Sequence, residues 1–236
     1  MAQKIIDIPG IGRVLFSKRR GSTHLRLSVT AAGVVRVSLP YWAPYAAGIQ
    51  FAKSRADWVH SQLLKHDSAA LIDGSAIGKA HRLYFREVKG SIGVATRVTA
   101  NEILISSSLS PDSAEVQAKA RSAAEKALKK EADKLLPQRL AYLAEKHGYE
   151  YKSLKIRKLT SRWGSCSSGK VITLSYFLMQ LPWPLIDYVL VHELLHTKFM
   201  HHGSLFWEQF ESIMPGAKKL RKEVNTHKPR IQPITF

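Results

Sequence analysis

Cysteine and long apolar stretches are the scarcest features of this 236-residue sequence. Its one cysteine, Cys166, can form no disulfide within the chain, which is typical of a reducing compartment and excludes a multi-cysteine zinc finger. No apolar stretch approaches the ~20 residues that cross a bilayer, and the first residues, MAQKIIDIPG, do not resemble a secretory signal. We therefore expect a cytoplasmic protein without a membrane segment.

Acidic residues are also few, because 18 Asp and Glu stand against 36 Lys and Arg, which gives a formal charge of +18. Such a charge attracts nucleic acid, anionic membrane surfaces or acidic proteins at long range, although a basic surface that binds none of these is an equally good interpretation. Hydrophobic residues make up 45% of the chain, which predicts a sizeable core in one large domain or two modest ones. Nucleic acid is one candidate partner, and charge alone does not decide it.

The N-terminal part of the sequence contains short runs in which apolar and polar residues alternate, as is typical of β-strands. Six segments are expected to form strands: residues 13–17, 23–29, 34–39, 82–87, 94–99 and 102–106. Ala32-Gly33 is the expected turn between the second and the third. Residues 44–65 have helical apolar spacing instead. We interpret residues 1–108 as a β-rich region with one helix.

A Ser-rich stretch ends this region, and a long helix is expected after it. Pro111-Asp112-Ser113 is a good helix start, and residues 114–146 are rich in Ala, Lys, Glu and Leu, with Pro137 expected to break or kink the helix. Two more strands and a helix complete the expected elements: residues 153–160, 170–174 and 185–200. We interpret residues 109–236 as a second domain, which makes the chain an α+β protein.

The segment His192-Glu193-Leu194-Leu195-His196 has the clearest chemical meaning in the sequence. On a helix, residues four apart project from one face, so His192 and His196 are spaced to share one tetrahedral Zn²⁺. Glu193 lies next to the first ligand, where its carboxylate can take a proton from an activated water molecule. The alternative is a helix whose histidines are only surface or core residues. The preferred interpretation is a zinc hydrolase with Glu193 as the general base.

A third metal ligand should come from the residues that follow this motif. On a continued helix, His201 would point away from His192, and His202 would lie roughly 80° off the face that His192 occupies. We therefore expect the helix to end near His201 and a turn at His202-Gly203 to bring a ring back to the metal, using the positive φ that glycine allows. His202 is the preferred third ligand. The alternatives that stay open are His201, Glu208 and Glu211.

Two further segments are close enough in sequence to contribute to this site. Aromatic residues follow the motif at Phe206, Trp207 and Phe210. They could line a substrate groove, but packing as core against the metal helix is preferred. The Arg162–Ser168 loop could also approach the site, where Arg162 would bind a carboxylate or an oxyanion. The structural alternative for this loop is a tight turn anchored by Trp163.

Three segments resemble the YgjP-like metallopeptidases, which are relatives of the SprT and WLM zinc peptidases: residues 161–174 (SRWGSCSSGKVITL), 181–196 (LPWPLIDYVLVHELLH) and 201–207 (HHGSLFW). The resemblance implies a minimal zincin-like fold of the SprT and gluzincin type, with His192, His196 and His202 as zinc ligands. It also implies Glu193 as the catalytic residue. Ser175 departs from the family pattern, in which Asn is frequent at this position. SprT and WLM relatives cleave proteins crosslinked to DNA, and a similar substrate here is an analogy.

Three functions are compatible with these features. The first, and preferred, is a zinc-dependent peptidase that acts on a protein or peptide substrate. The second is a nucleic-acid-associated protein in which zinc is mainly structural, and a DNA-stimulated protease combines the two. The third is a zinc hydrolase that acts on a non-peptide bond, because the same metal and carboxylate can hydrolyse several substrate classes.

Overall fold

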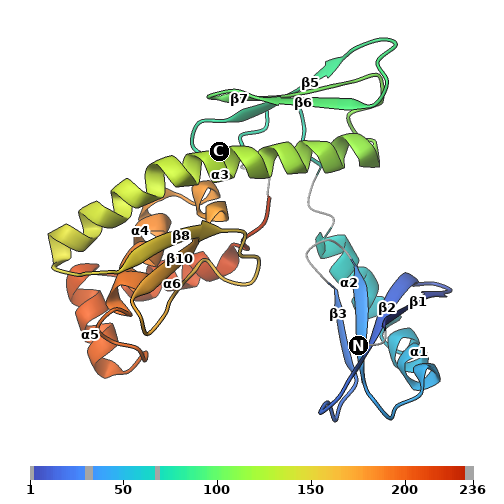
Figure 1. Cartoon of the computed structure of the whole chain (residues 1–236), viewed down its shortest axis with the longest axis horizontal. Coiled ribbons are helices and arrows are strands. Elements are labelled where there is room, and N and C mark those ends of the chain that lie inside the picture. Colours follow the sequence, from blue (N-terminus) through green and yellow to red (C-terminus); the bar gives the residue numbers. More distant parts are fainter. Residues whose placement is uncertain (1–2, 30–33, 67–69, 232–236) are drawn as a thin grey trace. The chain divides into compact units, whose positions relative to one another are not determined.

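The computed structural model describes residues 3–29, 34–66 and 70–231 of the chain. Its contacts divide the chain into two compact units, Met1–Ser68 and Ala69–Phe236 (Figure 1). Each unit combines a sheet or sheets with helices, so the α+β architecture expected from the sequence is confirmed. No helix in these described ranges is long and apolar enough to cross a membrane.

The first unit is a four-stranded sheet with two helices packed on one face. Its elements are β1 (Gln3–Ile8), β2 (Gly12–Arg19), β3 (Arg26–Val29), β4 (Val35–Pro40), α1 (Tyr45–Lys53) and α2 (Ala56–His66). The strand order is β1-β2-β4-β3, in which β2 and β4 run parallel and the outer pairs are antiparallel. Alternate residues of the two inner strands form the core with α1 and α2: Val14, Phe16, Val35, Val37 and Leu39.

The sequence predicted most of this unit but missed one strand and one helix break. β1 was not predicted because Ile5 and Ile6 are adjacent, which hides the alternation, and Ile5 is 56% exposed on the outer side. The single helix expected over residues 44–65 is two helices, and the hydroxyl of Ser54 donates to the Phe51 carbonyl at the end of the first. The expected turn at Ala32-Gly33 lies outside the described residues.

The second unit is organised around the long helix α3 (Ala114–His147). The other elements are β5 (Arg82–Glu87), β6 (Val94–Val98), β7 (Glu102–Ser107), β8 (Ser153–Arg157), β9 (Gly164–Cys166), β10 (Val171–Ser175), the 3-10 helix η1 (Tyr176–Gln180), α4 (Trp183–Leu195), α5 (Ser204–Ile213) and α6 (Ala217–Thr226). One sheet has the order β5-β7-β6 and the other β8-β10-β9. Figure 1 shows the two sheets on opposite sides of α3, which contacts both.

Helix α3 begins and ends with well-formed caps. The Ser113 hydroxyl accepts the N–H of Val116, and Gly148 adopts the left-handed conformation, φ 68°, that ends the helix. The break or kink expected at Pro137 does not end the helix, which is continuous over 34 residues. Proline cannot donate to the carbonyl four residues earlier, and that residue, Asp133, lies on the exposed side, where water can take the place of the missing donor.

The boundary between the compact units differs from the division between residues 108 and 109 that the sequence suggested. Strands β5 to β7 belong with α3, because Leu83, Ile103 and Ile105 share one buried cluster with Val116 and Ala120. A three-stranded sheet of this size needs an apolar partner to bury its face, and the alanines of α3 allow close approach. The Ser-rich stretch before α3 is therefore a connection inside the second unit.

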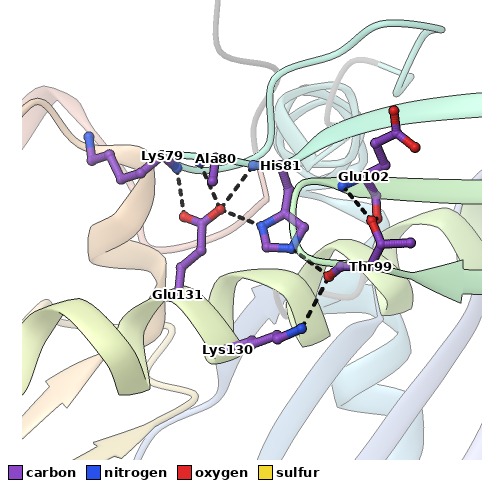
Figure 2. Close-up of polar contacts among 7 residues, drawn as sticks. All are labelled: Lys79, Ala80, His81, Thr99, Glu102, Lys130 and Glu131. Carbon is purple, nitrogen blue, oxygen red and sulfur yellow. Dashed lines mark hydrogen bonds and ion pairs between the residues drawn. The ribbon is translucent and has the colours of Figure 1, made fainter.

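A buried carboxylate joins this small sheet to α3 (Figure 2). Glu131 accepts the backbone N–H groups of Lys79, Ala80 and His81 at 2.6, 3.0 and 3.0 Å, and it also contacts Nδ1 of His81. The other ring nitrogen of His81 lies 3.3 Å from the Thr99 carbonyl oxygen. Both ring nitrogens of His81 therefore lie beside oxygen acceptors, one on α3 and one in the turn after β6.

The same segment reaches the start of α4. Lys79 donates from Nζ to the carbonyl of Leu181 and lies 5.5 Å from the ring centroid of Trp183. Gly78 is required here, because a Cβ would lie 2.3 Å from a carboxylate oxygen of Glu131. These contacts connect the segment before β5 with both α3 and α4, and α4 carries the site described below.

The strands expected at residues 82–87, 94–99, 102–106, 153–160 and 170–174 are confirmed with small shifts at their ends. β9 was not predicted, because its three residues lie in a spacer whose composition is typical of a turn. Ser175, where the family pattern often has Asn, is fully buried. Its hydroxyl donates to the Leu159 carbonyl. The same hydroxyl accepts the N–H of Phe177, so Ser175 is the N-terminal cap of η1.

Candidate metal centre

Helix α4 carries the His192-Glu193 pair and ends at Leu195, with His196 as its C-terminal cap. The helix is apolar nearly all round because it contacts α3, β9, α5 and α6. It ends several residues before the position expected from the sequence, since Thr197 and Lys198 turn back to the carbonyls of Leu194 and Leu195. This early end leaves a short loop before α5.

That loop returns His202 to the helix, so three histidine rings meet at one point. Ligand atoms of His192, His196 and His202 lie within 4.8 Å of one another. The Nε2 atom of His192 is 3.2 Å from that of His196 and 3.0 Å from that of His202. Nitrogen ligands of one tetrahedral zinc ion, at their usual bond lengths, lie about 3.3 Å apart. The three histidines therefore fit a single metal ion of this type.

The other candidates for a third ligand lie elsewhere. His201 is exposed and is not a member of the histidine cluster. Glu211 accepts the backbone N–H of Gly216, and Glu208 lies on the exposed side of α5. Gly203 has φ −74°, so the positive φ expected there is not used, and Gly203 is the N-terminal cap of α5.

Neighbouring groups fix the orientation of the histidine rings. Nδ1 of His196 lies 2.9 Å from the carbonyl oxygen of Phe199, so this nitrogen donates and Nε2 keeps a lone pair for a metal. The buried ring of Phe206 lies 4.8–5.2 Å from the centroids of all three histidine rings. The prediction that Phe206 packs against this helix as core is confirmed.

Burial favours the neutral form of His192 and of His202, which is the form that metal ligands require. The pKa of His192 is lowered to about 3, chiefly by burial and then by the positive charges of His196, His202 and Arg221. The pKa of His202 is also lowered, again mainly by burial. At neutral pH both rings therefore have a free lone pair.

Glu193 lies beside the cluster and is almost completely buried, with 5% of its surface exposed. Burial raises its pKa to about 8, and the nearby charge of Arg162 opposes this rise. Its Oε2 atom has no hydrogen-bond partner among the described residues. A Cβ on Gly164 would lie 2.7 Å from Oε1 of Glu193, so the backbone of β9 passes directly over this carboxylate.

A cavity of about 490 Å³ opens over the histidines. Part of its wall comes from residues 161–166, so the loop singled out in the sequence does approach the cluster. Trp163 is half-buried, and its carbonyl accepts the N–H of Ser175. The loop therefore both approaches the histidines and is anchored at Trp163. β9 is the edge strand of its sheet, which leaves a backbone edge beside this cavity.

Sequence reasoning missed residues on the other flank of Glu193. Tyr188 and Arg221 line a second cavity together with Glu193. Tyr188 is four residues before His192, and this helical spacing could have identified it. Arg221 comes from α6, and no local pattern connects it with the motif, because only the tertiary fold brings the two together.

A histidine cluster that could hold a metal ion, next to a buried glutamate, is the arrangement of a metal-dependent hydrolase. The family model described as "YgjP-like, metallopeptidase domain" matches residues 23–227, and the chain belongs to this family. Among solved structures, the chain is similar to the metallopeptidase zymogen of Pyrococcus abyssi abylysin. The two are 28% identical over 42% of this chain and 99% of that chain, with a TM-score of 0.37. No curated protein matches the chain.

Proposed function

We propose that this chain is a zinc-dependent peptidase in which His192, His196 and His202 hold the metal and Glu193 is the general base. The convergence of three Nε2 atoms beside a buried carboxylate is the observation that carries this proposal. Three nitrogen ligands with an open fourth side match a catalytic zinc site better than a closed structural one. A zinc ion bound there would polarise the scissile carbonyl and acidify a water molecule.

The role of Glu193 follows from its burial. A carboxylate without a hydrogen-bond partner on Oε2 is available to accept a proton from the attacking water. Burial is the largest cause of its raised pKa, and a cation beside it favours the charged form that accepts the proton. As a carboxylic acid, Glu193 then donates the proton to the leaving amine of the cleaved peptide.

The edge of β9 offers a place for the substrate backbone. Only one side of β9 pairs with a described strand, through Gly164, Ser165 and Cys166 to β10. An extended peptide can add to such an edge by backbone hydrogen bonds, which do not depend on the identity of its side chains. This placement would lay the scissile carbonyl beside the histidines, since β9 and the cluster line one cavity.

The test of this function is peptide hydrolysis by the zinc-loaded full-length chain and its Glu193→Gln variant. We expect the variant to bind zinc as the wild type does and to lose roughly 10²- to 10⁴-fold in kcat, because the general base is removed. Glu208→Gln, the same change on the exposed side of α5, is the control and should cleave normally. Hydrolysis of esters but not of peptides would instead favour a non-peptide substrate.

A second candidate function, nucleic-acid binding, is favoured by the outer face of the first sheet. Residues 1–68 contain ten Lys and Arg against three Asp and no Glu. On β2, β3 and β4, four exposed arginines alternate with the buried core and form what we term the arginine face: Arg13, Arg19, Arg26 and Arg36, with Ser17, Ser28 and Ser38 between them. None of these arginines forms an ion pair with a described residue.

Exposed aromatic rings follow this face directly. Tyr41 and Trp42, just after β4, are 58% and 77% exposed, and Arg20 lies 5.4 Å from the Tyr41 ring. Arginines suit phosphate oxygens and exposed rings can stack on bases, so we propose single-stranded nucleic acid as the partner. An anionic membrane is less well matched, because the apolar residues among these arginines are few, Leu15 and its register partner Ile5, and three serines lie on the same face.

Binding of a single-stranded oligonucleotide over a range of salt concentrations tests this second function. Replacing Arg19 and Arg36 by Gln should weaken binding and reduce the salt slope by ~0.7 for each phosphate that the protein no longer neutralises. Lys53→Gln, on the helical side of the unit, should change neither. Absence of binding at low salt, or binding to phosphatidylserine vesicles alone, would contradict the proposal.

A further inference from the structure

A second cavity, of about 330 Å³, lies on the flank of Glu193 away from the three-histidine cluster. Its wall consists of the Ser161–Gly164 segment before and at the start of β9, the middle of α4, the last turns of α6 and the segment after α6. His192 and Glu193 line both this cavity and the one over the histidines. A group held in the second cavity is therefore next to the reacting atoms of a bound peptide.

The charged side chains in this wall are almost all basic. Arg162, Arg221, His227 and Lys228 line the cavity, and Glu193 is the one acidic residue among its lining residues. Both arginines line the same wall as Glu193 and Tyr188, so both guanidinium groups are available to a group held in the cavity. The wall is positive where it meets the catalytic carboxylate.

Arg162 and Arg221 do not form ion pairs with acidic side chains of the described residues. Glu193 shares this wall with both arginines, and its Oε2 atom accepts no hydrogen bond from any described residue. Arg221 instead lies 4.8 Å from the ring centroid of Trp207, a contact that positions the guanidinium without satisfying its donors.

We propose that this cavity is a substrate subsite for a carboxylate of the peptide that is being cleaved, held by Arg162 and Arg221. The inference rests on the proposed peptidase function. The volume of the cavity suits one residue of a peptide. A planar carboxylate can accept paired hydrogen bonds from a guanidinium. The carboxylate can come from an Asp or Glu side chain or from the free C-terminus of the peptide. The enzyme thus prefers acidic peptides or peptide ends.

Matched peptides separate these two sources. Each peptide carries Glu, Gln or Lys beside the scissile bond, in one series far from the C-terminus, and a second series ends there as a free acid or an amide. We expect the zinc-loaded chain to cleave one anionic series with kcat/KM roughly 10- to 100-fold above that for its neutral partner, as loss of a charged hydrogen bond predicts. Equal kcat/KM for anionic and neutral peptides in both series would overturn the proposal.

Two variants from different elements assign the preference to this cavity. Arg162→Gln and Arg221→Gln should each reduce the ratio of kcat/KM for anionic over neutral peptide about tenfold. Arg221→Glu should turn the preference toward the Lys peptide. Lys222→Gln on the same helix, outside the lining residues, should keep the wild-type ratio. A ratio unchanged in both arginine variants contradicts the subsite.

A binding measurement distinguishes failure of the subsite from failure of the peptidase. Zinc-loaded Glu193→Gln protein is titrated with labelled anionic and neutral peptides, and its Arg221→Gln derivative is titrated in parallel. Tighter binding of the anionic peptide that is lost with Arg221→Gln supports the subsite even if the wild type cleaves no peptide. Equal binding of both peptides, or none, overturns the subsite even if the wild type is an active peptidase.

Discussion

At the scale of single residues, the close approach of Gly164 to Glu193 explains a glycine that the sequence leaves unexplained. A Cβ at position 164 would meet the buried carboxylate at 2.7 Å, so no other residue fits without displacing it. The requirement is steric and does not come from a special backbone conformation. No local pattern could have predicted it, because the atom that excludes a side chain belongs to a helix later in the chain.

The histidines of α4 show the opposite case, because local helix geometry alone predicted that His192 and His196 lie on one face. The four-residue spacing of His192 and His196 fixes both on one helix face whatever the rest of the fold does. His202 followed from the argument that the helix must end and return a ring, although the helix ends at Leu195 and the turn uses no positive φ at Gly203. The structure brings His202 to the other two histidines by a different backbone path, and its role as a metal ligand stays a prediction.

At the scale of elements, Glu131 of α3 and the residues just before β5 form a polar junction that should be essential for the stability of the second unit. Glu131→Gln replaces an acceptor of four hydrogen bonds by an amide that cannot accept them all. We expect a loss of ~3 kcal/mol in the free energy of unfolding, because each buried donor left without its acceptor costs ~1–3 kcal/mol. Urea unfolding of the full chain, followed by fluorescence, measures this loss.

The control for this prediction is Glu145→Gln, the same substitution at an exposed position of α3. It should change the free energy of unfolding by no more than ~0.5 kcal/mol. If both variants unfold at the same urea concentration, the buried junction does not stabilise the unit, and the connection of the segment before β5 with α3 and α4 must depend on apolar packing alone.

A strand or helix could be predicted where the pattern of its own residues is enough to identify it. β2, β4 and β7 alternate cleanly and were found, while β1 and β9 were not, because one is masked by adjacent isoleucines and the other is three residues in a turn-like spacer. The continuity of α3 through Pro137 could not be predicted, because it depends on Asp133, whose carbonyl loses its donor, lying on the exposed side of the folded helix.

At the scale of the whole molecule, the two units carry different features. All residues of the candidate metal centre and of the proposed carboxylate subsite belong to Ala69–Phe236, and the arginine face belongs to Met1–Ser68. The net charge of the chain suggested a basic surface without locating it. Its location needed the strand register, which separates the buried residues of β2 and β4 from the arginines between them.

Zinc content per chain tests the central claim most directly. Full-length protein, stripped of metal and then dialysed against zinc, should retain a single zinc ion per chain. His202→Ala should lose affinity by more than the roughly 10- to 100-fold that loss of an outer-shell partner costs, whereas the neighbouring His201→Ala should bind zinc as the wild type does. Wild-type protein that retains no zinc, or His202→Ala protein that binds it unchanged, would contradict the three-histidine site.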